Sequence, residues 1–87
     1  MIYVIAWSFK PECRNAVEAR FKETGDPPPE GTKMLGRWHG IGINKGVCVA
    51  ESDDGLALAR WAHEWSDLMS CDIYPALTDE DTAKVIS

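Results

Sequence analysis

The segment Ile2–Phe9 most constrains what this chain can fold into, because it is apolar throughout. Successive side chains of a strand point to opposite faces of the sheet. The two faces of this segment would carry Tyr3, Ile5, Trp7 and Phe9 on one side and Ile2, Val4 and Ala6 on the other. Since neither set is polar, both faces of the sheet that contains this strand need to be covered.

The segment after this strand is typical of a helix followed by a stiff connection. Pro11 and Glu12 suit a first helical turn, since proline needs no amide partner there and an acid faces the positive end of the helix dipole. The apolar stripe of this helix consists of Cys13, Val17 and Phe21, and the charged Arg20 keeps it narrow. Gly25 ends the helix, and three successive prolines within Asp26–Gly31 hold the next segment extended.

A β-hairpin is predicted in the middle of the chain. Two strand-like segments, Met34–Ile43 and Val47–Ser52, flank the turn Asn44-Lys45-Gly46. Gly46 can take the left-handed position of a type I turn followed by a bulge. This turn would place Ile43 opposite Val47.

A second helix, a last strand and a short terminal helix complete the order. Asp53 or Asp54 can cap the second helix, whose apolar stripe is Leu58, Trp61, Ala62 and Trp65. The last strand is Cys71–Leu77, and Pro75 within it favours a sheet edge because proline cannot donate to a neighbouring strand. Thr78 begins the terminal helix.

The resulting order is strand, helix, strand, strand, helix, strand and short helix, which is the split βαβ pattern. We therefore expect a single α+β domain over residues 1–87, with a ferredoxin-like fold and a four-stranded antiparallel sheet. Right-handed crossovers give the strand order four, one, three, two, which puts the Pro75 strand on an edge. Helices on one face leave the apolar second face bare, so we expect a homodimer that packs two sheets face to face, a dimeric α/β barrel.

The charge and cysteine content narrow the partners and the compartment. Nine Lys and Arg against fourteen Asp and Glu give a formal charge of −5, with no basic stripe. Because phosphate binding requires cations, this balance argues against nucleic acid and against an anionic membrane surface. Cys13, Cys48 and Cys71 form no paired motif, which favours reduced thiols in the cytoplasm, and no export signal or membrane span is evident.

The predicted hairpin would bring together a candidate catalytic pair. Its turn sets His39 opposite Glu51 and Arg37 opposite Asp53, all on one sheet face. A carboxylate beside a histidine can orient the imidazole and raise its pKa, as a general base or acid requires. The competing interpretation is a cross-strand ion pair that only stabilises the hairpin. A loop longer or shorter by one residue would separate these side chains onto opposite faces.

Four tryptophans in a short chain suggest a pocket for a flat apolar ligand, although most buried indoles serve only to pack the core. Trp38 lies between Arg37 and His39 on the opposite strand face and is a candidate wall. The candidate ligand-binding residues are Arg37, Trp38 and Trp7, with Arg37 holding an anionic group.

A metal site is not expected. His63 and Asp67 share a helix face at four-residue spacing, as in helical metal motifs. The second histidine of such a motif is missing, and a solvated helix face explains the pair better. No cofactor is indicated by any other motif.

Several segments together resemble a bacterial family, the domain of unknown function 3303 family. These segments are Trp7-Ser8-Phe9-Lys10-Pro11, Pro27-Pro28-Pro29-Glu30-Gly31, Leu35-Gly36-Arg37-Trp38-His39-Gly40, Glu51-Ser52-Asp53-Asp54 and Trp65-Ser66-Asp67-Leu68. The resemblance implies a dimeric α/β barrel built from two ferredoxin-like protomers. It implies no catalytic residue.

Three functions are compatible with these features. The first is binding of a small aromatic or anionic ligand in a pocket between sheet and helices. The second is a cofactor-free enzyme of oxygenase or isomerase type with His39 as base and Glu51 as its orienting partner. The third is a structural or regulatory dimer without ligand, in which tryptophan side chains would fill the pocket.

Overall fold

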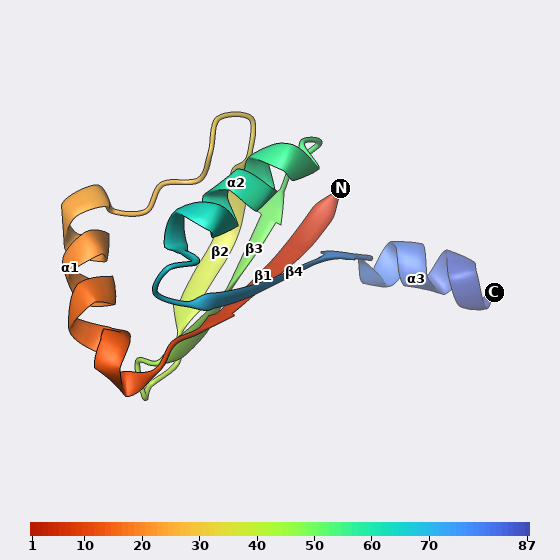
Figure 1. Cartoon of the computed structure of the whole chain (residues 1–87). Helices are drawn as coiled ribbons and strands as arrows, with labels where there is room; N and C mark the ends of the chain where they lie inside the picture. The colour runs from red at the N-terminus through yellow and green to blue at the C-terminus, as the bar shows by residue number, and fades with distance from the viewer.

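The computed structural model describes residues 1–87 as one four-stranded antiparallel sheet with helices beside it (Figure 1). The elements are β1 (Ile2–Ser8), the 3₁₀ turn η1 (Pro11–Cys13), α1 (Arg14–Thr24), β2 (Lys33–His39), β3 (Lys45–Glu51), α2 (Gly55–Trp65), β4 (Ser70–Ala76) and α3 (Asp79–Ile86). The strand order is β2-β3-β1-β4, and every neighbouring pair is antiparallel. The predicted ferredoxin-like order, with the Pro75 strand on an edge, is confirmed.

The helix boundaries follow the local chemistry of the sequence. Pro11 opens a single 3₁₀ turn that leads into α1, and Gly25 ends α1 with a left-handed φ of 69°. The Asp54 side chain caps α2 by accepting from the amide of Ala57 at 3.1 Å. Thr78 caps α3 in the same way. None of the three α-helices is long and apolar enough to cross a membrane.

The core lies between α2 and one face of the sheet. α2 contributes three buried residues, Leu58, Trp61 and Trp65, whereas α1 contributes only Val17. Figure 1 shows α2 lying across the sheet and α1 standing at one end beside it. The narrow stripe predicted for α1 therefore corresponds to a helix that packs loosely.

The hairpin between β2 and β3 differs from the prediction. β2 ends at His39 and β3 begins at Lys45, so the loop is Gly40–Asn44, closed by a hydrogen bond from the Gly40 amide to the Lys45 carbonyl at 2.8 Å. The predicted opposition of Ile43 and Val47 is wrong, because Ile43 adopts a φ of 72° inside the loop. The observed register sets His39 opposite Gly46.

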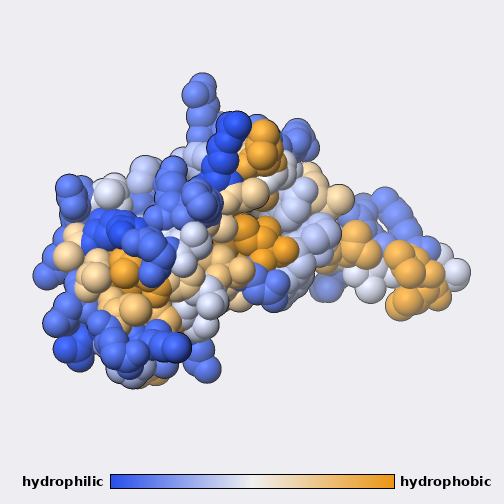
Figure 2. All heavy atoms as spheres, in the orientation of Figure 1, coloured by the Kyte–Doolittle hydropathy of each residue, from blue (hydrophilic) through white to orange (hydrophobic).

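The second face of the sheet carries apolar side chains that no element of the chain covers. Val4, Val47 and Val49 are partly exposed there, and Trp38 and Tyr74 are exposed by 59% and 46%. The α3 helix projects away from the body and leaves Val85 and Ile86 in solvent (Figure 1). Figure 2 shows apolar surface at this protruding end of the molecule.

Gly46 is required where Trp7 crosses the hairpin. A Cβ at position 46 would collide with the Trp7 indole and would lie 2.6 Å from the carbonyl oxygen of Trp38. We expect Gly46→Ala to lower the free energy of unfolding by about 1–3 kcal/mol, as overpacking does, in urea titrations. Gly36→Ala is the control: the three atoms nearest to its Cβ all belong to the exposed indole of Trp38, which can rotate away, so a change within about 0.5 kcal/mol is expected. Equal losses in the two variants would contradict this account.

Candidate functional site

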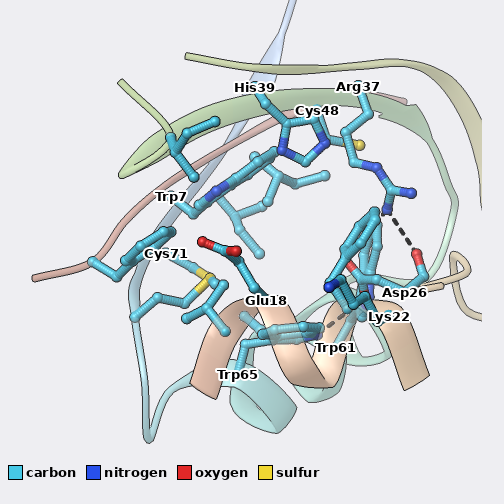
Figure 3. A pocket seen from close by; sticks show the side chains of 18 residues that line it. Trp7, Glu18, Lys22, Asp26, Arg37, His39, Cys48, Trp61, Trp65 and Cys71 are labelled. Atoms are coloured by element: carbon cyan, nitrogen blue, oxygen red, sulfur yellow. Dashed lines mark hydrogen bonds and ion pairs between the residues drawn. The ribbon is translucent and has the colours of Figure 1, made fainter. Parts of the chain in front are cut away.

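A cavity of about 340 Å³ lies between α1, α2 and the covered face of the sheet (Figure 3). Hydrophobic side chains make up 13 of its 18 lining residues. They are Ile5, Trp7, Phe9, Val17, Phe21, Ile43, Cys48, Trp61, Ala62, Trp65, Met69, Cys71 and Ile73, and the others are Glu18, Lys22, Asp26, Arg37 and His39. Figure 2 shows apolar surface between α1 and the body, ringed by hydrophilic residues.

The cavity follows from how its walls are built. Strand alternation turns Ile5 and Trp7 of β1 toward the helices, and the same rule turns Cys71 and Ile73 of β4 that way. The apolar stripe of α2 closes the opposite side. Because α1 buries only Val17, it leaves space between its own inner face and the sheet.

Asp26 connects three elements at one end of the cavity. Its Oδ1 accepts a hydrogen bond from the Trp61 indole at 2.7 Å and another from the Trp65 indole at 3.0 Å. The backbone of Asp26 has a φ of 44°, a left-handed conformation that non-glycine residues rarely adopt. Buried indole N–H groups need acceptors, and this carboxylate satisfies two of them.

Arg37 donates to the same residue from β2. Its Nη1 lies 2.7 Å from the carbonyl oxygen of Asp26 and 3.3 Å from Oδ2, and its guanidinium stands 5.0 Å from the centre of the Phe21 ring. The Arg37 side chain is only 18% exposed. Its charge is therefore matched within the protein by Asp26.

His39 lines the cavity but has no carboxylate beside it. The imidazole lies edge-on to Trp7 at 5.5 Å and to Phe21 at 5.6 Å between ring centroids. The predicted pairing with Glu51 is wrong, because His39 lies opposite Gly46 and Glu51 lies five residues further along β3. At about 3.4 Å per residue, this separation is about 17 Å. Glu51 also faces the other side of the sheet. The shift arises because the loop lies earlier in the chain than predicted, at residues 40–44, so that Lys45 and Gly46 belong to β3.

The other predicted site residues separate into two groups. Arg37 and Trp7 line the cavity, whereas Trp38 lies on the uncovered sheet face and does not. The predicted pairing of Arg37 with Asp53 is also wrong, because Arg37 lies opposite Cys48. Asp53 instead lies 3.6 Å from the N-terminal amine.

Cys48 and Cys71 contribute apolar wall rather than nucleophiles. Burial raises the pKa of both thiols; the Arg37 charge partly offsets this rise in the pKa of Cys48, and the Asp26 carboxylate adds to it for both. A thiol whose pKa is raised stays protonated near neutral pH. All three cysteines are free.

A second ionic contact ties α1 to the end of α2. Arg20 donates to both carboxylate oxygens of Asp67, at 2.9 and 2.8 Å, and to the carbonyl oxygen of Glu64 at 2.7 Å. This hydrogen bonding lowers the pKa of Asp67 and raises that of Arg20. Asp67 is thus bound to an arginine, and no group of three or more His, Cys, Asp or Glu side chains that could hold a metal ion is present.

Sequence reasoning missed Asp26, Glu18 and Lys22. Asp26 was interpreted only as the start of the proline segment, and Glu18 and Lys22 were not singled out. One signal for Asp26 was available: two tryptophans four residues apart on an apolar helix face need hydrogen-bond acceptors. The narrow apolar stripe of α1 was the one sequence signal for the space between this helix and the sheet, and it did not indicate which polar side chains would line that space.

The chain belongs to the family described as Domain of unknown function (DUF3303), whose model matches residues 1–87. It is also similar to the solved structure of Rv0793 from Mycobacterium tuberculosis, with 15% sequence identity and a TM-score of 0.54. The alignment covers 90% of this chain and 96% of that one. This likeness supports the ferredoxin-like fold. A search of curated proteins finds no match.

Removing the Asp26 carboxylate should loosen the end of the cavity. We expect Asp26→Ala to lower the free energy of unfolding by about 3 kcal/mol, since it leaves the indole N–H groups of Trp61 and Trp65 without an acceptor. Asp26→Asn keeps one acceptor oxygen and tolerates the left-handed backbone, so a smaller loss is expected. Urea unfolding followed by tryptophan fluorescence measures both. Wild-type stability in Asp26→Ala would refute the connecting role.

Proposed function

We propose that this member of the family is a cytoplasmic homodimer that binds a small aromatic molecule in the cavity between α1, α2 and the sheet. The cavity itself carries the proposal. Its volume of about 340 Å³ falls within the range of small-molecule sites, about 300–1,000 Å³. Its walls are mostly hydrophobic with a few polar groups, which is the usual composition of such sites. Three free cysteines agree with a reducing compartment.

The aromatic character of the ligand rests on the rings around the cavity. Trp7, Phe21, Trp61 and Trp65 all line it. Aromatic rings favour offset and edge-to-face contacts with other rings, so a flat ring system fits these walls better than an alkyl chain. The sequence also allowed an anionic ligand held by Arg37, and that alternative loses support because Asp26 already neutralises the guanidinium.

The two alternative functions have less support. An enzyme with His39 as base relied on Glu51 to orient the imidazole, and Glu51 faces the other side of the sheet. A ligand-free structural dimer requires the tryptophans to fill the pocket, whereas Trp7, Trp61 and Trp65 line a measurable cavity. Binding is therefore the function that these residues favour.

The homodimer rests on the uncovered sheet face. Valines of β1 and β3 lie there with Trp38 and Tyr74, and no helix of the same chain reaches them. Large exposed apolar patches mark interaction surfaces, and a two-fold pair would cover this face on both protomers at once. The apolar residues of α3, Val85 and Ile86, extend the surface available to a second protomer.

Filling the cavity should abolish ligand binding. We expect indole at ten times its Kd to stabilise the wild-type protein by about 1.4 kcal/mol, a rise in Tm of about 5–10 °C. Ala62 lines the cavity, so Ala62→Leu should remove this rise, because the added isobutyl group occupies the ligand's space. Ala59 is exposed on the same helix, and Ala59→Leu should keep the rise. Equal responses in both variants, or none in the wild type, would contradict binding in this cavity.

Placing a charge on the uncovered face should separate the protomers. Val49 lies near the middle of β3 on that face, and Val49→Glu would bury an unpaired carboxylate in a dimer interface. We expect the wild type to sediment as a dimer and Val49→Glu as a monomer in analytical ultracentrifugation. Ile41→Glu adds the same charge at a fully exposed loop position and should stay dimeric. A monomeric wild type at high concentration would overturn the homodimer.

A further inference from the structure

The charged groups around the cavity are not equivalent. Of its five polar lining residues, Asp26 and Arg37 bind each other and His39 is held edge-on between two rings. Glu18 and Lys22, one turn apart on α1, remain. The charge of the ligand therefore depends on which of these two side chains meets it.

Glu18 points its carboxylate into the cavity. Figure 3 shows the carboxylate between the labelled Trp7 of β1 and Trp65 of α2. Its ion-pair contact is with Arg14 one turn earlier, where the closest atoms are 3.8 Å apart, and the carboxylate makes no hydrogen bond. Its oxygens are thus available to accept hydrogen bonds from a ligand.

Lys22 contributes its charge elsewhere in the cavity. Figure 3 places it at the end where Asp26 and Arg37 lie, away from Trp7. Lys22 and Glu18 are both exposed, the Glu18 side chain by 47%, but a lysine stem can lie along apolar surface while its ammonium stays in water. The Trp7 side of the cavity is therefore left with the negative charge of Glu18.

The aromatic walls also favour a cation. Positive charges are attracted to the faces of aromatic rings, tryptophan most of all. Arg37 already stands over Phe21, and Arg20 over Trp65 at 5.3 Å. Trp7, which lines the cavity together with Glu18, has no such partner. The formal charge of −5 on the whole chain further attracts cations and repels anions.

We propose that the ligand is an aromatic amine, whose ring system occupies the apolar cavity and whose ammonium group lies between the Glu18 carboxylate and the Trp7 ring. This assignment rests on the proposed binding function and adds the charge of the ligand to it. A charge-assisted hydrogen bond to Glu18 would set the orientation of the amine. An aromatic acid would place its carboxylate against Glu18 and be repelled.

Three probes that share an indole ring and a two-carbon chain at its C3 position, and that differ in the group at the end of this chain, test the effect of ligand charge. They are tryptamine, which is cationic at pH 7, the neutral 3-ethylindole, and the anionic indole-3-propionate. Titration calorimetry on the wild-type protein measures each Kd. We expect tryptamine to bind at least tenfold more tightly than indole-3-propionate, with 3-ethylindole between them. Equal affinities, or the reverse order, would overturn the assignment.

Glu18→Gln keeps the size of the side chain and removes its charge. We expect its affinity for tryptamine to fall at least fivefold toward that of 3-ethylindole, while the affinity for 3-ethylindole itself stays unchanged. Glu23→Gln is the matched control, since Glu23 is exposed on the same helix and does not line the cavity; it should bind tryptamine as the wild type does. Unchanged tryptamine binding in Glu18→Gln would refute the role of Glu18. If 3-ethylindole binds and the two charged probes bind equally well, only the assignment of an amine is refuted. If no probe binds, the proposed binding function is refuted as well.

Discussion

The arrangement of the helices depends on the hydrogen bonds that the Asp26 carboxylate accepts. It follows directly after α1, accepts hydrogen bonds from two indoles of α2 and meets Arg37 from β2. Its backbone is held in a left-handed conformation, which costs a non-glycine residue free energy. Such strain persists only where the surroundings stabilise it, and here four hydrogen bonds to Trp61, Trp65 and Arg37 do so. The end of α1 is thereby fixed relative to both the sheet and α2.

Polar contacts of this kind hold α1 at a distance, and the cavity follows from that. A helix attached by a broad apolar stripe would sink onto the sheet until its side chains interdigitated. α1 has a narrow stripe, and it is joined to α2 by the long side chain of Arg20 and to the rest of the core through Asp26. These hydrogen bonds set the distance from α1 to α2 and to the sheet, and they do not maximise the apolar contact between them. The space that remains is bordered by the aromatic residues that would otherwise have packed against the helix.

The sequence predicted the fold well and the candidate site poorly, for different physical reasons. Strand order, helix caps and the edge position of Pro75 follow from rules that depend only on a residue and its neighbours in the sequence. The hairpin register depended on loop length, and Ile41 and Ile43 looked like strand residues although both lie in the loop. Because of that one error, the predicted pairing of Glu51 with His39 was wrong. The role of Asp26 depends on side chains 35 and 39 residues away, which no local pattern reveals.

Backbone strain at two residues of the cavity supports the proposed binding function. The chain has two non-glycine residues with positive φ, Asp26 at 44° and Ile43 at 72°, and both line the cavity. A β-branched side chain in this conformation is unfavourable by about 1–2 kcal/mol, and glycine at position 43 would relieve that strain. Strained residues gather at binding and catalytic sites, where the shape of the site is worth more than local stability. The coincidence of both outliers with one aromatic-walled cavity therefore favours a site that binds a ligand over a gap left by imperfect packing.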